Sequence, residues 1–512
     1  MKFRLPERLQ FKLGDAWLNL AARWPRLPNS TDLRRIRRDI RRQARRHYRN
    51  SRPPQGIELQ YLFFRMMELF HVSELDKLQA GLERLFPDLR DVHYYQDFIR
   101  EYAGDILGGG SVNIGTVVRK RQGPSNSGMF SDPAVPGLPK EVERVDFWLH
   151  KILPSAIVVS MDVHLNEAAT QQLIRVHSKR YPTKVRFKNS LPFTVLGSNY
   201  TQEPASNLMR QEVLGWHDEL RSRVEFEFRP FLNGYFTREV AGKKASLPVI
   251  EVYALKGAPQ EDFATWIEKK YNWWRSLGFE AIRNAYMDEK LLFIPPRSGV
   301  NAGQSPYRLI ALWEPYINSL GSERMQIYHG DEGTAITMTL EDILSSLFRS
   351  VTILQFLNKS KRKTERLRQI VFGSLKHGFR LGKYFKLNNA IQREVMLLDR
   401  ISMEYEQVTD EIRHDLKGVA NLKELFTYSR GREADSLADV LPNQITFIIG
   451  AVGKQLKHIN ESFSTHLVTR NMYATYLLAL AVGLATFVGL SASWASIKVL
   501  AQDFWHLMTT IF

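Results

Sequence analysis

The alternation of apolar and polar positions divides the chain into a region of short apolar runs and a region of helical periodicity. Runs such as SAIVVSMDVH at 155–164 and PVIEVYAL at 248–255 have the length of strands. Between them, the segment that begins at Asn166, a favourable residue at a helix start, is typical of a helix. Strands that alternate with helices predict an α/β domain with a mixed sheet over residues 141–338.

Two further patterns in this region predict a hairpin and a helix. RVEFEF at 223–228 alternates apolar with acidic residues, and Asn233 and Gly234 follow it between apolar residues. Asn-Gly pairs favour tight hairpins, because both turn residues take a positive φ. The run at 261–278 closes with a glycine and predicts a helix. Additional strand-like runs are TKVRFK, RLIALWE, RMQIYH and GTAITMT.

Helical spacing begins at Thr339 and continues toward the end of the chain. Thr339 and Asp342 form a pattern that resembles a capping box. Beyond them, apolar residues recur every three or four positions in three successive segments, the third of which starts near Asn443. This pattern predicts a long helical or coiled-coil stalk over residues 339–470.

An uncharged stretch of 26 residues, Met472–Ile497, follows this predicted stalk. As a helix it is about 39 Å long, which exceeds the about 30 Å of a bilayer core. Tyr476 and Trp494 lie near its ends, where amphipathic rings favour the lipid–water interface. We therefore expect one C-terminal transmembrane helix at 471–497 that continues the stalk, and a buried helix of a large core is the alternative. Residues 498–512 mix apolar with charged side chains and predict an amphipathic helix at the membrane surface.

Small and weakly polar residues gather on one side of the predicted span. Small residues let helix backbones approach closely, and hydroxyl groups can bond across the contact. This face predicts contact between the spans of a homo-oligomer, and a narrow wet path or a chance pattern are the alternatives. The residues of this helix-packing or pore face are Thr475, Ala479, Gly483, Thr486, Gly489 and Ser493.

The beginning of the chain is basic and contains a second apolar concentration. The run IELQYLFFRMMELF at 57–70 is rich in large apolar side chains, and we expect residues 1–107 to form a basic helical region. Glycine, proline and serine are frequent from 108 to 140, which predicts a linker. The first residues lack the apolar block of a signal peptide.

The charge around the predicted span indicates its orientation. Lys454, Lys457 and Arg470 precede the span, whereas Lys498 is the basic residue that follows it closely. Basic residues favour the cytoplasmic side of a membrane. We therefore expect a single-pass protein of the cell (inner) membrane whose N-terminal domain is cytoplasmic.

The net charge favours anionic partners. The chain has 71 lysines and arginines against 54 acidic residues, a net charge of +17. Arginine binds phosphate through two parallel hydrogen bonds, so the arginine-rich segment 31–52 predicts contact with anionic lipid or nucleic acid, and a solvated helix is the alternative. Lipid is slightly favoured, because Tyr48 is the only ring there that could stack on a base. The predicted anion- or phosphate-binding residues are Arg34, Arg37, Arg38, Arg41, Arg45, Lys361, Arg362 and Lys363.

The sequence carries little sign of catalysis. The absence of cysteine excludes disulfides, thiolate zinc sites and a thiol nucleophile, and no HExxH or GxSxG motif is present. Asp162 and His164 share a face of one predicted strand, and His150 could approach them. Polar residues at a strand end explain this group better than a metal site does. We expect no catalytic residue, metal or cofactor, and an enzymatic role is uncertain.

The order of predicted parts resembles the CorA-type divalent-cation channels. The resemblance rests on architecture over about residues 141–512: an α/β domain, long helices, a stalk that enters the membrane and a short tail. It implies a pentamer that conducts divalent cations. That family places Gly-Met-Asn at the end of the first span, where this chain has Gly489, Leu490 and Ser491. No selectivity residue therefore follows from the resemblance.

Three functional hypotheses follow from the sequence. The first is a membrane-embedded oligomer with a large cytoplasmic domain that senses or scaffolds, including an ion-conducting version. The second is a tail-anchored protein that binds nucleic acid or anionic lipid through its arginine-rich helices. The third is a membrane-anchored enzyme whose site has no recognisable motif.

Overall fold

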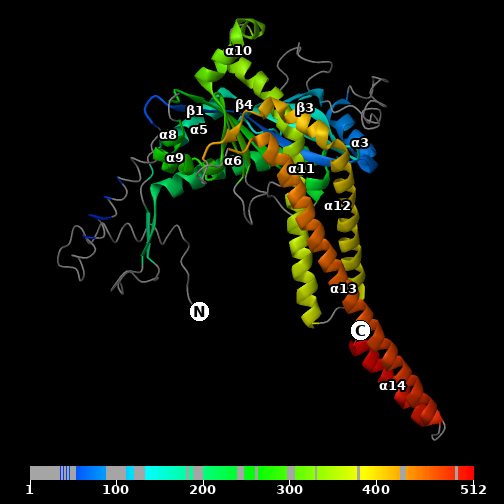
Figure 1. The fold of residues 1–512 in the computed structure, drawn as a ribbon. Coiled ribbons are helices and arrows are strands. Elements are labelled where there is room, and N and C mark those ends of the chain that lie inside the picture. Colours follow the sequence, from blue (N-terminus) through cyan, green and yellow to red (C-terminus); the bar gives the residue numbers. More distant parts are fainter. Residues whose placement is uncertain are drawn as a thin grey trace. The chain divides into compact units, whose positions relative to one another are not determined.

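The computed structural model describes two compact units, which we call the sheet unit and the helical unit (Figure 1). The sheet unit comprises residues 1–348 and 415–439, and the helical unit comprises residues 349–414 and 440–512. The described residues are 35, 38, 39, 42, 45, 54–87, 111–119, 133–179, 181, 184–187, 200–238, 247–259, 263–296, 306–328, 331–377, 381–426, 434–489 and 494–511.

A mixed nine-stranded sheet forms the centre of the sheet unit. Its strands, in spatial order, are β11 (Lys423–Glu424), β8 (Tyr286–Met287), β9 (Leu291–Ile294), β10 (Tyr307–Leu312), β7 (Val249–Lys256), β1 (Glu58–His71), β4 (Ala156–Leu165), β3 (Val142–Leu153) and β2 (Ser111–Val118). Neighbours are antiparallel except β7 and β10, which are parallel. The mixed sheet that the sequence predicts is therefore present, and it takes β1, β2 and β11 from outside residues 141–338.

The helix predicted at 57–70 is wrong, because these residues form β1 in the middle of the sheet. From Phe63 to Phe70 every residue of β1 is buried. A strand that is covered on both faces has a nearly continuous apolar sequence, which periodicity cannot distinguish from a buried helix. In the described part of this region, the strand is followed by a short 3-10 turn at Val72–Glu74 and by the helix α3 (Leu75–Leu85).

The predicted hairpin at 223–234 is also wrong. RVEFEF forms the end of a 24-residue helix, α6 (Ala205–Phe228), and Gly234 precedes the short helix α7 (Tyr235–Arg238). A Cβ atom on Gly234 would lie 2.5 Å from the carbonyl oxygen of Leu69, so this glycine permits a close backbone approach. The strands predicted at RMQIYH and GTAITMT are likewise helical, in α10 (Trp313–Ile327) and α11 (Glu332–His377).

Other local predictions are confirmed. The runs at 155–164 and 248–255 form β4 and β7, and TKVRFK forms β5 (Lys184–Phe187), which pairs with β6 (Tyr200–Glu203). RLIALWE at 308–314 forms most of β10, and its last two residues begin α10. Asn166 caps α5 (Glu167–Ser178), since its side chain accepts a hydrogen bond from the Ala169 amide. Gly278 has φ = 88° and ends the predicted helix, which consists of α8 (Phe263–Lys269) and α9 (Tyr271–Ser276). Short 3-10 helices occur at Ile282–Asn284 and Leu416–Val419.

Three long helices form most of the helical unit. α11 continues into it from the sheet unit, and α12 (Leu381–Asp415) and α13 (Leu437–Gly489) follow. The predicted cap at Thr339 is wrong, because α11 begins at Glu332 and the Thr339 hydroxyl donates to the Ala335 carbonyl inside the helix. The helical spacing itself is confirmed.

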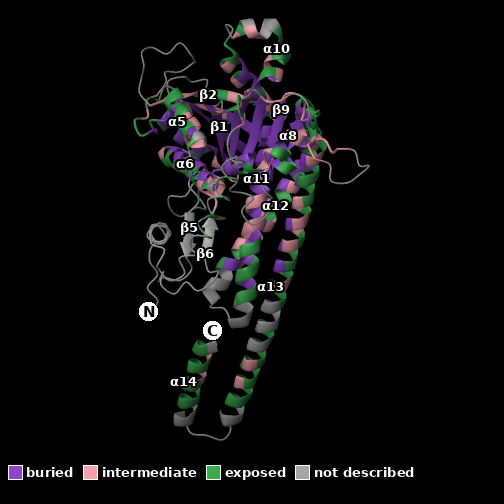
Figure 2. Cartoon of the chain, turned by 90° about the vertical axis from the view of Figure 1, so that its left-hand side faces the viewer, coloured by how far each residue is buried: buried purple, intermediate pink, exposed green. Residues whose placement is uncertain are grey.

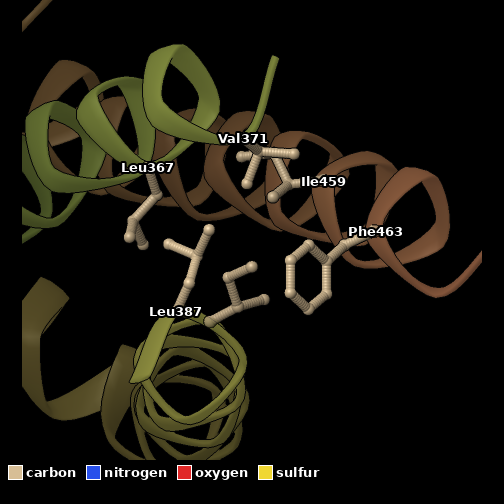
Figure 3. Close-up of a cluster of buried hydrophobic side chains, with 6 residues drawn as sticks. Leu367, Val371, Leu387, Ile459 and Phe463 are labelled. Carbon is tan, nitrogen blue, oxygen red and sulfur yellow. The ribbon is translucent and has the colours of Figure 1, made fainter. Parts of the chain in front are cut away.

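Apolar side chains join these three helices at one level of the bundle (Figure 3). The cluster consists of Leu367 and Val371 from α11, Leu387 and Ile391 from α12, and Ile459 and Phe463 from α13. All six side chains are buried, so the apolar spacing in the sequence corresponds to a packed seam.

The predicted transmembrane helix at 471–497 is wrong. Within the described ranges, no helix is both long enough and apolar enough to cross a membrane. The uncharged stretch is divided between two helices, because α13 ends at Gly489 and α14 spans Trp494–Ile511. The uncharged part of α13 from Met472 is about 27 Å long, against about 30 Å for a bilayer core. The lack of charge over 26 residues therefore does not mean that they form one uninterrupted helix.

Candidate functional site

A row of polar side chains crosses one face of the sheet. The strand register places Thr116 of β2 beside Asp146 of β3, Asp146 beside Asp162 of β4, and Asp162 beside Arg65 of β1. Residues that pair across neighbouring strands project from the same face of a sheet. Four adjacent strands therefore bring together two carboxylates, a guanidinium group and a hydroxyl group.

The inner half of this row is a closed ion pair. Arg65 donates two hydrogen bonds of 2.6 Å to the two carboxylate oxygens of Asp162. The side chains of Arg65 and Asp162 are 2% and 0% exposed, so water does not reach the pair. Burial by itself lowers the pKa of Arg65, but the carboxylate of Asp162 and, more weakly, that of Glu341 raise it overall. This pair is a structural contact between β1 and β4.

The outer half of the row is a cluster of ionisable groups that is slightly exposed to solvent. His164 Nε2 lies 3.0 Å from an oxygen of Asp146 and 3.8 Å from an oxygen of Glu341, which belongs to α11. Asp146 also accepts hydrogen bonds from the Thr116 hydroxyl at 2.6 Å and from Arg144 Nε at 3.0 Å. Two carboxylates from different elements thus face one imidazole nitrogen.

The environment separates the pKa values of these two carboxylic acids. Burial by itself raises the pKa of Asp146, but the contacts with His164, Arg144 and Thr116 outweigh it and hold the pKa at about 2. Burial, together with the nearby charge of Asp162, raises the pKa of Glu341 to about 7. Glu341 therefore exchanges a proton near neutral pH, which is characteristic of functional groups but occurs in structural networks as well.

The imidazole of His164 is held by packing. Its ring stacks on Phe63 with 5.2 Å between ring centroids, and its side chain is 8% exposed. Among the described residues, Nε2 makes no hydrogen bond with favourable geometry, so its contact with Asp146 is chiefly electrostatic. The ring is therefore fixed against Phe63 with Nε2 facing the two carboxylates.

His150, Asp162 and His164 share a face of the sheet but do not form a metal site. Asp162 is bound to Arg65, and His150 Nε2 lies 2.9 Å from the Ser160 hydroxyl. Burial, with a further effect from Arg65, lowers the pKa of His150 well below its usual value, so its ring is neutral. Among the residues that the structure describes, no group of three histidine, aspartate or glutamate side chains is arranged to hold a metal ion.

Sequence reasoning found Asp162 and His164 but missed their partners. Arg65 lies 97 residues before Asp162, and Glu341 lies on a helix whose start was predicted to be a strand. One signal was present: Arg65 lies within a mostly apolar run in β1, and a buried arginine needs an acidic partner.

A second ionic cluster is buried on the opposite face of the sheet. Glu251 of β7 accepts hydrogen bonds from Arg221 of α6 and, at 2.6 Å, from Arg308 of β10. The Tyr253 hydroxyl donates to Glu251 at 3.0 Å. Burial lowers the pKa of His217 well below its usual value, so this adjacent ring is neutral. Two arginines share one carboxylate, which ties α6 to β7 and β10.

The predicted anion-binding residues fall into two groups. Arg34, Arg37 and Arg41 lie outside the described residues, whereas Arg38 and Arg45 are helical and exposed. Arg35 and Arg42 are also helical and exposed, and the spacing 35, 38, 42, 45 corresponds to one helix face.

The three basic residues on α11 are partly buried within the protein. Lys361, Arg362 and Lys363 are half-buried, and Lys363 Nζ lies 2.5 Å from the buried carboxylate of Glu394. Burial, together with the charge of Arg366, lowers the pKa of Arg362. The charge available to an external anion is therefore smaller than the sequence indicates.

The predicted helix-packing face is described in part. Thr475, Ala479 and Gly483 are exposed on α13. Thr486 and Gly489 lie within α13, but the structure does not describe their exposure. Ser493 is outside the described residues. The structure therefore leaves this face as a prediction.

Many residues at the end of α13 and along α14 are exposed (Figure 2). Ten of them have large apolar side chains. On α13 these are Met472, Tyr476, Leu478, Leu480, Val482 and Leu484, and on α14 they are Val499, Leu500, Trp505 and Leu507. Their exposed fractions lie between 48% and 72%. Soluble surfaces rarely carry so dense an apolar patch, so this surface is a candidate for contact with lipid or protein.

Comparisons with known proteins do not assign the chain to a family. No protein-family model matches it, and neither a curated protein nor a solved structure shows significant similarity.

Proposed function

We propose that this protein is an oligomeric, membrane-associated scaffold whose helical unit docks into one side of a lipid bilayer. The observation that supports this proposal is the exposed apolar surface at the end of α13. No crossing helix is required, because a segment can enter the acyl region and leave on the same side.

The arrangement of side chains around α13 favours lipid over a single flat partner. Successive residues are 100° apart on a helix, so Leu478 and Val482 lie on one side of α13 and Leu480 and Leu484 lie on the nearly opposite side. Each of these four side chains is at least 50% exposed. A helix that exposes apolar side chains on two opposite sides needs cover on both, which lipid provides and one flat protein surface does not. Burying each side chain is worth about 1.5–3 kcal/mol.

The sequence of α14 is compatible with a position at the membrane surface. Around this helix, Leu500, Phe504, Leu507 and Met508 fall on one side, and the charged or polar Lys498, Gln502, His506 and Thr509 fall on the other. Trp505 is an exception, since it lies on the polar side. An apolar face opposite a polar face is typical of helices that lie at the interface. Lys454 and Lys457, exposed on α13, add a preference for anionic head groups.

Flotation with lipid vesicles tests the proposal. The full chain should float with phosphatidylcholine vesicles, and more completely when they contain phosphatidylserine. The variant Leu480→Gln/Leu484→Gln should lose most of this binding. The control Met396→Gln/Met403→Gln removes two exposed apolar side chains from α12 of the same unit and should bind normally. Wild-type protein that stays in the aqueous fraction, or equal loss in both variants, would refute lipid docking.

Oligomerisation is a separate part of the proposal. The predicted small-residue face supports contact between subunits. Particle mass in detergent tests this part. A monomer would remove it and leave lipid docking intact.

A second candidate function is binding to nucleic acid. Exposed Arg35, Arg38, Arg42 and Arg45 on one helix face support it, since such a face can neutralise several phosphates. Fluorescence anisotropy with a single-stranded oligonucleotide should then show binding that weakens steeply with salt. If replacing the four arginines with glutamine leaves binding unchanged, this function is excluded.

A further inference from the structure

The first part of α11 packs on the sheet through an apolar face that contains one ionisable residue. Leu340, Leu344 and Leu347 are buried, and the side chain of Glu341 is 14% exposed. Glu341 Oε1 lies 3.8 Å from His164 Nε2, a separation longer than a hydrogen bond. The contact between helix and sheet thus includes a carboxylate whose nearest cationic partner among the described residues, His164, lies beyond hydrogen-bond distance.

We propose that Glu341, His164 and Asp146 form a proton-responsive contact that fastens the first part of α11 to the sheet. The contact is tight when the Glu341 carboxyl group is protonated and loosens when it ionises. This inference concerns the sheet unit alone and does not rest on the proposed lipid docking.

The charges that face Glu341 from every neighbouring strand support this direction. Asp146 and Arg144 come from β3, Asp162 and His164 from β4, and Arg65 from β1. Arg65 is already bound by Asp162 through both of its 2.6 Å hydrogen bonds, and Arg144 is bound by Asp146. An ionised Glu341 therefore meets two carboxylates whose arginines are occupied, and it competes with Asp146 for His164.

Charges on the same helix do not change this balance. Asp342 is exposed, and Glu332 accepts a hydrogen bond from the Trp313 indole at 2.8 Å. Neither has a described contact with His164. Asp342 is therefore a matched control, because it is the adjacent acid on the same helix but does not face the cluster.

The direction of the pH effect follows from proton linkage. The pKa of Glu341 is about 7 in the folded protein, against 4.5 for the free side chain. Between these values the folded contact holds a proton that the opened state releases, so the contact weakens as pH rises. The contact has its full strength below about pH 4.5 and is weakest above about pH 7. The difference of about 2.5 units limits the effect to about 300-fold in the opening equilibrium.

Amide hydrogen exchange of the full chain tests this contact. After correction for intrinsic exchange rates, protection of residues 333–348 should fall several-fold, and at most about 30-fold, between pH 5.5 and pH 8. Glu341→Gln should make protection nearly independent of pH, whereas Asp342→Asn should behave like the wild type. Circular dichroism confirms that each variant is folded.

Infrared difference spectroscopy provides a second readout. The wild type should lose one protonated-carboxyl band with a midpoint near pH 7, and Glu341→Gln should lack this band. Unchanged pH dependence in Glu341→Gln, or loss of it in Asp342→Asn, would overturn the proposal. If Glu341→Gln does not fold, absence of the band in the wild type overturns it instead.

Discussion

Replacement of Asp162 by asparagine should be among the most damaging single changes in the sheet unit. Asp162→Asn keeps the shape of the side chain but removes its charge, so the Arg65 guanidinium group stays buried without its counter-ion. The two hydrogen bonds of 2.6 Å are each assisted by charge, and such bonds contribute about 1.5–3 kcal/mol each. Breaking one side of a buried ion pair costs about 3–5 kcal/mol, which agrees with their sum.

The loss of stability in Asp162→Asn should depend on pH, because the carboxyl group of Glu341 lies nearby. The negative charge of Asp162 is one cause of the raised pKa of Glu341, after burial. In Asp162→Asn the pKa of Glu341 should fall, so that Glu341 ionises and partly compensates Arg65. The loss of stability should therefore be smaller at pH 8 than at pH 5.5.

Urea denaturation followed by tryptophan fluorescence measures the effect. Trp273 and Trp274 are 2% and 0% exposed within the sheet unit, so they report on its unfolding. The midpoint should fall while the slope stays constant. The double variant Arg65→Met/Asp162→Leu removes both charges and should recover most of the loss, since apolar pairs often replace buried ion pairs without cost. A penalty below about 1 kcal/mol, or a double variant as unstable as the single one, would refute the argument.

Three further changes test local features of the fold by the same denaturation assay. Gly81→Ala places a Cβ atom 2.0 Å from the carbonyl oxygen of Phe231, so it should cost about 1–3 kcal/mol, and a loss within error would contradict this close approach. Asn166→Ala removes the cap of α5 and should cost about 1 kcal/mol, whereas Asn166→Ser should retain most of it. Phe463→Ala leaves a cavity between α11, α12 and α13 and should cost about 3–5 kcal/mol, measured by circular dichroism of the helical unit; unchanged helix stability would show that the cluster does not hold the helices together.

Strands and helices with a clear period were predictable from the sequence. The helix after Asn166 and the stripes of the three long helices follow from local spacing and capping, because these depend on residues a few positions apart. β1 and the end of α6 were not predictable in this way. The first is buried on both faces and loses its alternation, and the second alternates by coincidence within a longer helix.

The candidate site was likewise predictable only in part. The shared face of Asp162 and His164 follows from the two-residue period of a strand. Their partners do not, because the register of β1, β3 and β4 and the path of α11 bring Arg65, Asp146 and Glu341 to them.

Residues 472–497 show what composition does and does not determine. Composition establishes that Met472–Ile497 is uncharged, but the tertiary structure ends α13 at Gly489 and begins a new helix at Trp494. Sequence alone determined the periodicity of the elements and the overall basic charge. Only the tertiary structure decided which charges neutralise one another, because that outcome depends on contacts between segments that lie far apart in the chain.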